Sequence, residues 1–553
     1  MGSVGASNLW RRFTFVSKSD IASGTNSEND GVKRGTFSVN VFAQVFSFIV
    51  SIGIGVMLTP YLIHKLGPAY YGLIPLSLTI ISYCGILTVA INTSVSRSLI
   101  QAIERKEASQ ANLIFNTSVA VCISIAAIVA TALVAATTFL DRLVLVPEDG
   151  LAQARWLFGC TAVSFVVSTL VTPFSVSAFC RNRFEITHAI SITRNIVRVS
   201  MIVFLFWYTE PSLKSVGLAG LASVVVEAIL LFLAWRHLLP EIYFRVSNVE
   251  WATFKGLFST GVWVSVFQVG TILLLSIDLV LVNRIFGPAS GGEYAAVLQW
   301  SALLRNFSMS LAAVFAPTIM ALYGKGDFPA VAGYAIRASR FVGYCMSIPI
   351  AILCGLAPFV LSVWLGPEFA KLAPLMIVLV APLSINLAVM PLFSISIAAD
   401  KIKIPGILTI GSGVINLLLA IALATRTPLG ILGVALSGVI VLTLKNAIFT
   451  PIYAASNIDH SWRTFLTPLI RLSLFAGMLA GAAWSASNII VIDSWLHIIS
   501  VSLSLAVVYS LLLYRFVMDQ EDRLFVNGKI HTLASRFGLG LLWENLPSSV
   551  RRP

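Results

Sequence analysis

Fourteen stretches of mostly apolar residues, each long enough to cross a lipid bilayer, follow one another along this chain. A membrane-spanning α-helix needs about 20 such residues. Of the 553 residues, 57% are hydrophobic and 11% are charged, whereas roughly a quarter of the residues in a soluble domain are charged. The sequence therefore predicts an all-α integral membrane protein with about fourteen transmembrane helices, and it argues against a soluble enzyme.

The apolar stretches form two groups of six, followed by a final pair. They cover residues 38–63, 70–92, 112–140, 155–180, 186–208 and 216–235; then 261–286, 294–322, 341–365, 372–399, 404–424 and 429–454; and last 465–487 and 495–514. The domains we expect are a disordered cytoplasmic tail (1–37), an N-terminal six-helix lobe (38–235), a cytoplasmic connector (236–260), a C-terminal six-helix lobe (261–454), an extra helix pair (455–514) and a cytoplasmic tail (515–553).

The positive charges are distributed unevenly over the predicted connections. Of the 37 Lys and Arg residues, 25 lie on the side that holds both termini and 6 on the other side. Cytoplasmic loops of membrane proteins carry this excess, so both termini are predicted to be cytoplasmic. The same bias accounts for most of the net charge of +13, and we therefore expect no nucleic-acid partner.

Sequence signals for catalysis or for a bound cofactor are absent from the chain. The six cysteines lie inside apolar stretches without a CxxC pair, and the six histidines show no metal-ligand spacing. There is no Walker motif and no GxSxG motif. We expect no catalytic residue, no cofactor, no metal site and no ATP hydrolysis.

Six ionisable residues inside the apolar stretches are the candidates for function. A charge at the bilayer centre costs at least about 2.5 to 3.5 kcal/mol, so such residues normally face a protein interior or water. Four are basic and two acidic: Arg194, Arg198, Arg305, Lys445, Glu227 and Asp278. The basic excess favours an anionic ligand, and the planar guanidinium of Arg suits phosphate. We therefore predict that the four basic residues bind substrate and that the two acidic residues are candidates for ion coupling.

Two other interpretations of these charges remain open. Glu227 with Arg198, and Asp278 with Arg305, would form ion pairs that only hold helices in register, although two cations would then stay unpaired. Arg194 lies close enough to the predicted cytoplasmic interface for its side chain to extend into water.

A short repeat relates the two groups of six. Residues 66–69, Leu-Gly-Pro-Ala, follow the first stretch, and residues 286–289, Phe-Gly-Pro-Ala, follow the seventh, 220 positions later. Both copies fall on the predicted outer side, where Gly and Pro turn the chain into the next helix. This predicts two lobes related by a parallel repeat.

Three segments are informative beyond their hydropathy. They are FAQVFSFIVSIGIGVMLTPYLIHKLGPAYYGL (42–73), PFSVSAFCRNRFEITHAISITRNIVRV (173–199) and VWLGPEFAKLAPLMIVL (363–379). Together with the order six, six and two, they resemble bacterial O-antigen and polysaccharide flippases. These form the polysaccharide-transporter branch of the multidrug/oligosaccharidyl-lipid/polysaccharide exporter superfamily.

The resemblance implies two lobes around a central cavity that opens alternately to each side of the bacterial plasma membrane. The cargo would be an oligosaccharide on a polyprenyl diphosphate, moved to the outer leaflet for O-antigen or exopolysaccharide assembly. Its partners would be membrane lipids and a polysaccharide polymerase or glycosyltransferases. Two alternatives stay open. One is a cation-coupled antiporter of drugs or organic cations, with which the acidic Asp278 in the seventh stretch is compatible. The other is a non-transporting scaffold for polysaccharide synthesis.

Overall fold

The computed structural model describes residues 27–181, 183–244, 251–487, 494–518, 520 and 523. Within these ranges, side chains are described except those of 27–43, 45, 86–94, 96–97, 251–265, 468 and 517. The described residues form helices and short turns, with no β-strand among them.

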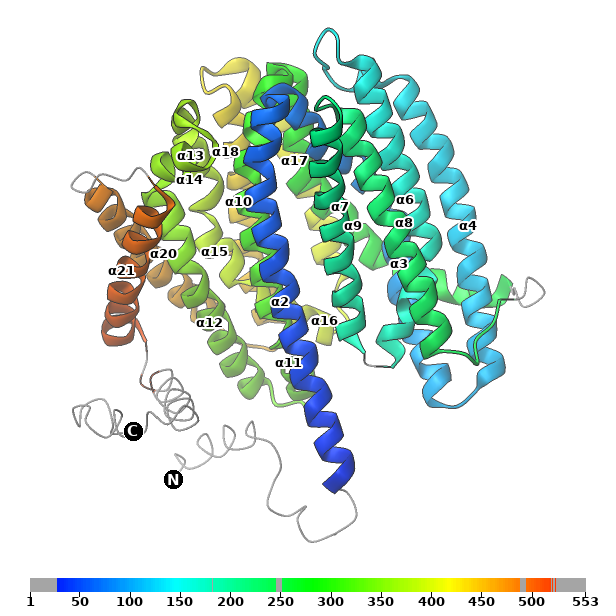
Figure 1. The fold of residues 1–553 in the computed structure, drawn as a ribbon. Coiled ribbons are helices and arrows are strands. Elements are labelled where there is room, and N and C mark those ends of the chain that lie inside the picture. The colour runs from blue at the N-terminus through cyan, green and yellow to red at the C-terminus, as the bar shows by residue number, and fades with distance from the viewer. Residues whose placement is uncertain are drawn as a thin grey trace, which may run out of the picture.

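The first group of helices precedes residue 240 (Figure 1). It consists of α2 (Ser27–Leu66), α3 (Pro68–Glu104), α4 (Ala108–Thr138), the short α5 (Leu140–Leu143), α6 (Leu151–Cys180), α7 (Phe184–Tyr208) and α8 (Leu213–Leu238). Helix α6 packs on α4 and α8, and α7 packs on α2 and α8.

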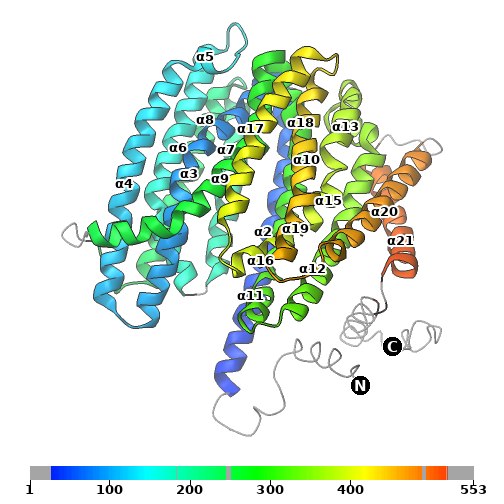
Figure 2. The same ribbon diagram turned by 180° about the vertical axis from the view of Figure 1, so that it is seen from behind.

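The second group follows residue 250. It consists of α9 (Trp251–Phe286), α10 (Pro288–Ala313), α11 (Ala316–Gly324), α12 (Phe328–Gly355), α13 (Ala357–Leu365), η3 (Pro367–Leu372), α14 (Ala373–Val380), α15 (Leu383–Ala388), η4 (Met390–Leu392), α16 (Phe393–Ala398), α17 (Lys403–Arg426), α18 (Ile431–Leu444), η5 (Lys445–Phe449) and α19 (Thr450–Ser456). Then come α20 (Arg463–Ser487), α21 (Trp495–Leu512) and η6 (Leu513–Val517). Helix α20 packs on α12, and α21 packs on α20 at one flank of the molecule (Figures 1 and 2).

The fold class is confirmed. Among the described residues, thirteen segments are long and apolar enough to cross a membrane, and the 37-residue α3 covers the remaining predicted stretch, 70–92. Large apolar side chains point outward, as they do in lipid-facing helices; Trp207 is 86% exposed and Leu496 is 74% exposed. The structure therefore has the helices expected of a protein with about fourteen spans.

Several helices extend beyond the predicted ends. Helix α2 begins at Ser27, so residues 27–37, predicted as part of a polar tail, are helical; residues 1–26 of that tail lie outside the described part. Helix α9 begins at Trp251, inside the predicted connector 236–260. Polar residues at a helix end continue the backbone hydrogen bonding outside the bilayer, which a hydropathy criterion does not detect.

Prolines break the predicted tenth span. Residues 372–399 form α14, α15 and α16 with a turn and a 3-10 segment between them. The breaks coincide with Pro382 and Pro391, because proline lacks the N–H that bonds the carbonyl four residues earlier and its ring clashes with that carbonyl. In the twelfth span, a π-helix over Lys445–Phe449 joins α18 to α19.

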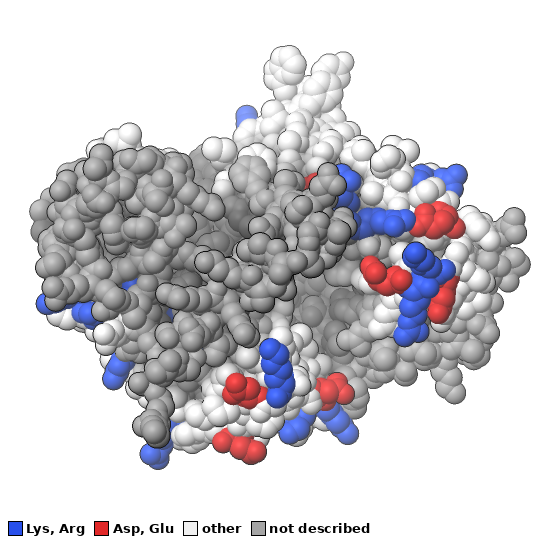
Figure 3. All heavy atoms as spheres, turned by 90° about the horizontal axis from the view of Figure 1, so that it is seen from below, with Lys and Arg blue, Asp and Glu red and all other residues white. Residues whose placement is uncertain are grey.

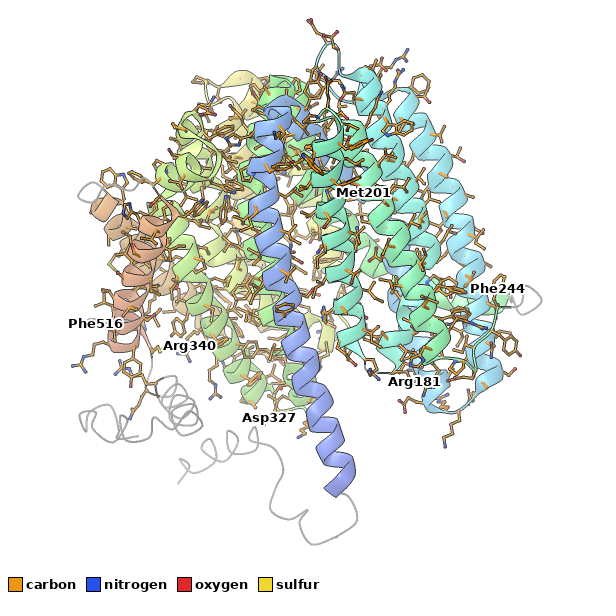
Figure 4. The ribbon with its side chains drawn as sticks, in the orientation of Figure 1. Arg181, Met201, Phe244, Asp327, Arg340 and Phe516 are labelled. Carbon is orange, nitrogen blue, oxygen red and sulfur yellow. The ribbon has the colours of Figure 1, made fainter. Side chains whose placement is uncertain are left out.

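We call the face where α2 ends and α3 begins the apical face, and the opposite face the basal face, at the top and bottom of Figure 1. Figure 4 places Arg181 and Asp327 at the basal ends of their helices. Helix α3 connects the two groups, because it packs on α9 and α10 as well as on α4 and α6. The largest buried apolar cluster likewise draws residues from both groups, such as Leu73 and Tyr294. These groups have the order expected of the N- and C-terminal lobes, whose boundaries stay a prediction.

Candidate functional site

Helix α7 presents two arginines four residues apart, on one helical face. Arg194 forms an ion pair with Glu227 of α8, with 3.1 Å between Nη1 and Oε2. The Arg194 side chain is 41% exposed and that of Glu227 is 18% exposed. The alternative interpretation that pairs Glu227 with Arg198 is therefore wrong: Glu227 is paired with Arg194, one turn nearer the basal face.

Arg198 has no such partner. Its side chain is partly buried, its Nε atom is buried without a hydrogen-bond partner, and within the described part of the chain no carboxylate forms an ion pair with it. At 1.5 Å per residue, it lies about 15 Å from the apical end of α7; Met201, labelled in Figure 4, follows it by one turn. Arg198 is thus a cation deep in the membrane region that no described side chain neutralises.

A polar group that joins both lobes lies close to Arg198. The hydroxyl of Thr59 on α2 donates to Oε1 of Gln299 on α10 over 2.6 Å, and it lies 3.4 Å from the hydroxyl of Tyr71 on α3. Arg198 lies within electrostatic range of Tyr71. On α7, Asn195 donates to Ser51 of α2. Sequence reasoning missed Thr59 and Gln299, whose only signal is a polar residue inside an apolar stretch.

The C-terminal lobe buries a carboxylate of a different kind. Asp278 on α9 is 6% exposed. Its Oδ1 accepts a hydrogen bond from Nδ2 of Asn416 over 3.0 Å, and its Oδ2 accepts one from the hydroxyl of Tyr294 over 3.4 Å. Ser437 in turn donates to Oδ1 of Asn416 over 2.8 Å. Neutral groups from three helices besides α9 thus surround Asp278.

Close packing on α18 completes this carboxylate site. A Cβ atom at Gly438 would lie 2.9 Å from Oδ2 of Asp278, so a larger residue at this position would require the carboxylate to shift. The ion pair of Asp278 with Arg305, which the alternative interpretation required, is not formed. Arg305 of α10 lies within electrostatic range of Asp278 and Tyr294 but forms no ion pair with a carboxylate in the described ranges.

Lys445 occupies a third environment, at the start of the π-helix in the C-terminal lobe. It is 7% exposed, and its Nζ lies 5.6 Å from the ring centroid of Phe267 and 5.5 Å from that of Phe393. Aromatic rings attract a cation at such distances. No carboxylate of the described residues forms an ion pair with Lys445. Next to it, Nδ2 of Asn446 donates to Oδ1 of Asn386 over 3.1 Å.

The six predicted residues thus fall into separate settings. Arg194 and Glu227 are paired within the N-terminal lobe. Arg198 lies within electrostatic range of Tyr71, and Arg305 within electrostatic range of Asp278. Lys445 has an aromatic surrounding of its own. Among the described residues, no group of three or more His, Cys, Asp or Glu side chains is able to hold a metal ion.

Comparisons with known proteins give the chain its relatives. A family model described as "Polysaccharide biosynthesis protein" matches residues 65–374. The uncharacterized membrane protein EpsK of Bacillus subtilis (strain 168) is 34% identical over 491 residues, which is 89% of this chain and 97% of that protein.

Solved structures agree with the fold. The lipid II flippase MurJ in an inward closed conformation superposes with a TM-score of 0.58 at 15% identity, over 86% of this chain and 98% of MurJ. An inward-facing multidrug resistance MATE transporter of the MOP superfamily superposes with a TM-score of 0.62 at 14% identity, over 75% of this chain and 96% of that chain. At these identities, the likeness shows a shared fold.

Proposed function

We propose, since this chain belongs to the polysaccharide biosynthesis protein family and has the fold of MOP-type transporters, that it flips a polyprenyl-diphosphate-linked oligosaccharide across the membrane. Transport would proceed by alternating access, without ATP hydrolysis, and would supply surface polysaccharide assembly. The cargo would enter from the cytoplasmic leaflet and leave in the outer leaflet.

Arg198 carries this proposal. An unpaired guanidinium in the membrane region is costly unless water or an anion accompanies it. A diphosphate offers oxygens that a guanidinium binds bidentately, at roughly twice the strength of a neutral hydrogen bond. The site therefore suits a lipid that carries its charge on a diphosphate between sugar and tail. Such a diphosphate can reach the level of Arg198 while the tail stays in the bilayer.

Neutral polar groups near Arg198 suit the sugar part of this cargo. Gln299 and Asn195 offer amide groups from two lobes, and Thr59 and Tyr71 offer hydroxyls. Such groups exchange hydrogen bonds with sugar hydroxyls readily. We propose that Arg194, Arg305 and Lys445 raise the positive potential around the diphosphate, with Arg198 as its direct partner.

The proposed orientation places the basal face in the cytoplasm. Figure 3 views this face, where Lys and Arg side chains lie together with Asp and Glu. The basal turns include basic residues such as Arg105, Lys106, Arg183 and Lys401, as the positive-inside rule requires of a cytoplasmic face. Both termini would then be cytoplasmic, in the plasma membrane of a bacterium.

Asp278 is the better candidate for ion coupling. Glu227 is already neutralised by Arg194, whereas the hydrogen-bond partners of Asp278 in the described part of the chain are neutral. A carboxylate in such surroundings can exchange a proton or hold a small cation, and intramembrane carboxylates commonly serve this purpose. We propose that loading of Asp278 changes the packing of α9, α17 and α18, the helices that meet there.

Reconstitution tests the proposal. Proteoliposomes with the full chain would receive a fluorescent polyprenyl-diphosphate oligosaccharide in one leaflet, and a membrane-impermeant quencher would report its arrival in the other. We expect flipping at a rate that exceeds that of protein-free vesicles. If the folded protein flips no such lipid, the proposal fails.

One alternative has a specific observation in its favour. The buried Asp278 and the shared fold with a MATE transporter are compatible with a cation-coupled antiporter of organic cations. Release of a fluorescent organic cation from the same vesicles, in exchange for protons or sodium, would support this alternative. A scaffold without transport activity predicts neither flux.

A further inference from the structure

Helix α2 contains a proline in its apical half. Pro60 lies within α2 and lacks an N–H group. In a regular α-helix, the N–H of residue 60 would bond the carbonyl oxygen of residue 56. The carbonyl of Val56 is therefore left without its partner inside the helix, and in the membrane region no bulk water replaces it.

The partner comes from the other lobe. Nε1 of Trp364, on α13 of the C-terminal lobe, donates to the carbonyl oxygen of Val56 over 2.6 Å. The Trp364 side chain is 4% exposed, so this hydrogen bond is shielded from solvent and lipid. The indole thus binds the one backbone group that Pro60 makes available.

A second contact fixes the same turn of α2. Thr59 donates to Oε1 of Gln299, on α10 of the C-terminal lobe, over 2.6 Å. A Cβ atom at Gly55 would lie 3.1 Å from Nε2 of Gln299, so the glycine leaves room for the amide to lie against α2. Two side chains of one lobe therefore hold a single turn of the other.

Further contacts close the apical face nearby. Gly72 of α3 and Gly292 of α10 stand 220 positions apart, the offset of the repeat, and a Cβ atom on Gly72 would lie 2.6 Å from the backbone nitrogen of Gly292. Asn283 of α9 bonds both the N–H and the carbonyl of Leu145, over 2.9 and 3.1 Å. The α2 contacts thus belong to a closed junction between the lobes.

We propose that Trp364 and Gln299 are positioning residues for transport: they hold α2 at Pro60 against the C-terminal lobe while the apical face is closed, and both contacts break when that face opens. The inference rests on the proposed alternating access, because a protein with fixed lobes has no use for releasable contacts. Pro60 makes the contact specific, since it directs a free carbonyl at the partner lobe.

A matched pair of variants tests Trp364. Trp300 packs edge to face on Trp364, with ring centroids 5.2 Å apart, and its own Nε1 is buried without a hydrogen-bond partner. Trp364→Phe removes an indole N–H that bonds Val56, whereas Trp300→Phe removes one that bonds nothing in the described structure. The two changes are equal in size and adjacent in place.

The measurement is the distance between the apical ends of the lobes in the full-length protein without cargo. Spin labels on Glu210→Cys and Arg426→Cys, both exposed and at apical helix ends, are compared in a background whose six native cysteines are replaced by alanine. We expect Trp364→Phe to raise the fraction of molecules with an open apical face about tenfold. The reason is that a lost buried hydrogen bond destabilises the closed state relative to the open one. Trp300→Phe should leave it unchanged.

Pro60→Ala completes the test. Alanine at position 60 supplies the missing N–H, so Trp364→Phe should change the distance distribution little in that background. If Trp364→Phe is too unstable to measure, Thr59→Val takes its place. It removes the donor to Gln299 and should likewise raise the apically open fraction. The inference is overturned if Trp364→Phe and Trp300→Phe give equal distributions, or if Pro60→Ala leaves the effect of Trp364→Phe intact.

This measurement is independent of the cargo. A shifted distribution in a protein that flips no diphosphate lipid would contradict the proposed cargo and retain the inference about α2. Normal flipping of the diphosphate lipid with unshifted distance distributions would support the proposed cargo and contradict the inference about α2.

Discussion

The two lobes hold their intramembrane carboxylates in opposite ways. In the N-terminal lobe, Glu227 neutralises Arg194 and leaves Arg198, one turn away, without a counter-ion among the described residues. In the C-terminal lobe, Asp278 is surrounded by an amide and a hydroxyl that satisfy it without neutralising it. In the first lobe, the guanidinium of Arg198 is available to an anionic ligand. In the second lobe, the carboxylate of Asp278 already has its hydrogen bonds, but it can still take up a proton or a small cation.

The largest effect is expected at Arg198. Arg198→Ala should lower the rate of lipid flipping about tenfold to a hundredfold, because a charge-assisted hydrogen bond contributes about 1.5 to 3 kcal/mol. Flipping in proteoliposomes, at matched amounts of folded protein, measures it. Arg198→Lys should recover part of the rate, since the charge returns without the planar guanidinium. A wild-type flipping rate in Arg198→Ala would contradict the role of Arg198 as the partner of an anionic ligand.

Asp278→Asn should remove the ion coupling that we assign to the C-terminal lobe. Asparagine keeps an acceptor for Asn416, so the protein should fold, but it can neither release a proton nor bind a cation by its charge. We expect flipping to fall about tenfold and to lose its dependence on the proton or sodium gradient. Transport assays with and without each gradient, beside wild type, provide the check. Retained gradient dependence would show that coupling lies elsewhere.

The Arg194 pair should respond more weakly. Because the Arg194 side chain is 41% exposed, the pair is expected to contribute no more than about 1 kcal/mol. Glu227→Gln and Arg194→Gln should each change flipping less than about threefold, and the double variant should melt at a higher temperature than Arg194→Gln alone. Thermal melting in detergent tests this, and a loss of flipping as large as that of Arg198→Ala would argue against the distinction between the two arginines.

Lys445 should show a small effect on transport, comparable to that of the Arg194 pair. Its Nζ is flanked by Phe267 and Phe393 rather than by groups shared between the lobes, so its charge would act on the diphosphate from a distance. Lys445→Met should slow flipping about twofold to threefold while Lys445→Arg stays near wild type. Raising the salt concentration should weaken this difference if it is electrostatic. A loss exceeding that of Arg198→Ala would move the anion site into the C-terminal lobe.

The sequence was sufficient for the helices but not for the contacts between them. Spans were predictable because a bilayer requires about 20 apolar residues in succession, and buried charges were visible because they interrupt such runs. The pairing of Glu227 with Arg194 rather than Arg198 depends on the rotation of α7 against α8, which one-turn spacing does not specify. Asn416, Ser437 and Gln299 resemble any polar residue that bonds between helices.

Pro60 shows the same limit from another direction. A proline in an apolar stretch predicts a free carbonyl four residues earlier, yet only the tertiary structure shows that Trp364, 308 positions away in sequence, donates to it. Helix ends such as Ser27 were missed because helical hydrogen bonding continues beyond the apolar region.

The most direct test of a cationic site for a diphosphate compares two fluorescent lipids with the same oligosaccharide and polyprenyl chain, one joined by a diphosphate and one by an uncharged linker. Flipping of each would be measured in proteoliposomes with wild type and with Arg198→Ala. The account predicts that wild type flips the diphosphate lipid at least about tenfold faster and that Arg198→Ala largely abolishes this preference. Equal rates for both lipids in wild type, or an undiminished preference in Arg198→Ala, would contradict it.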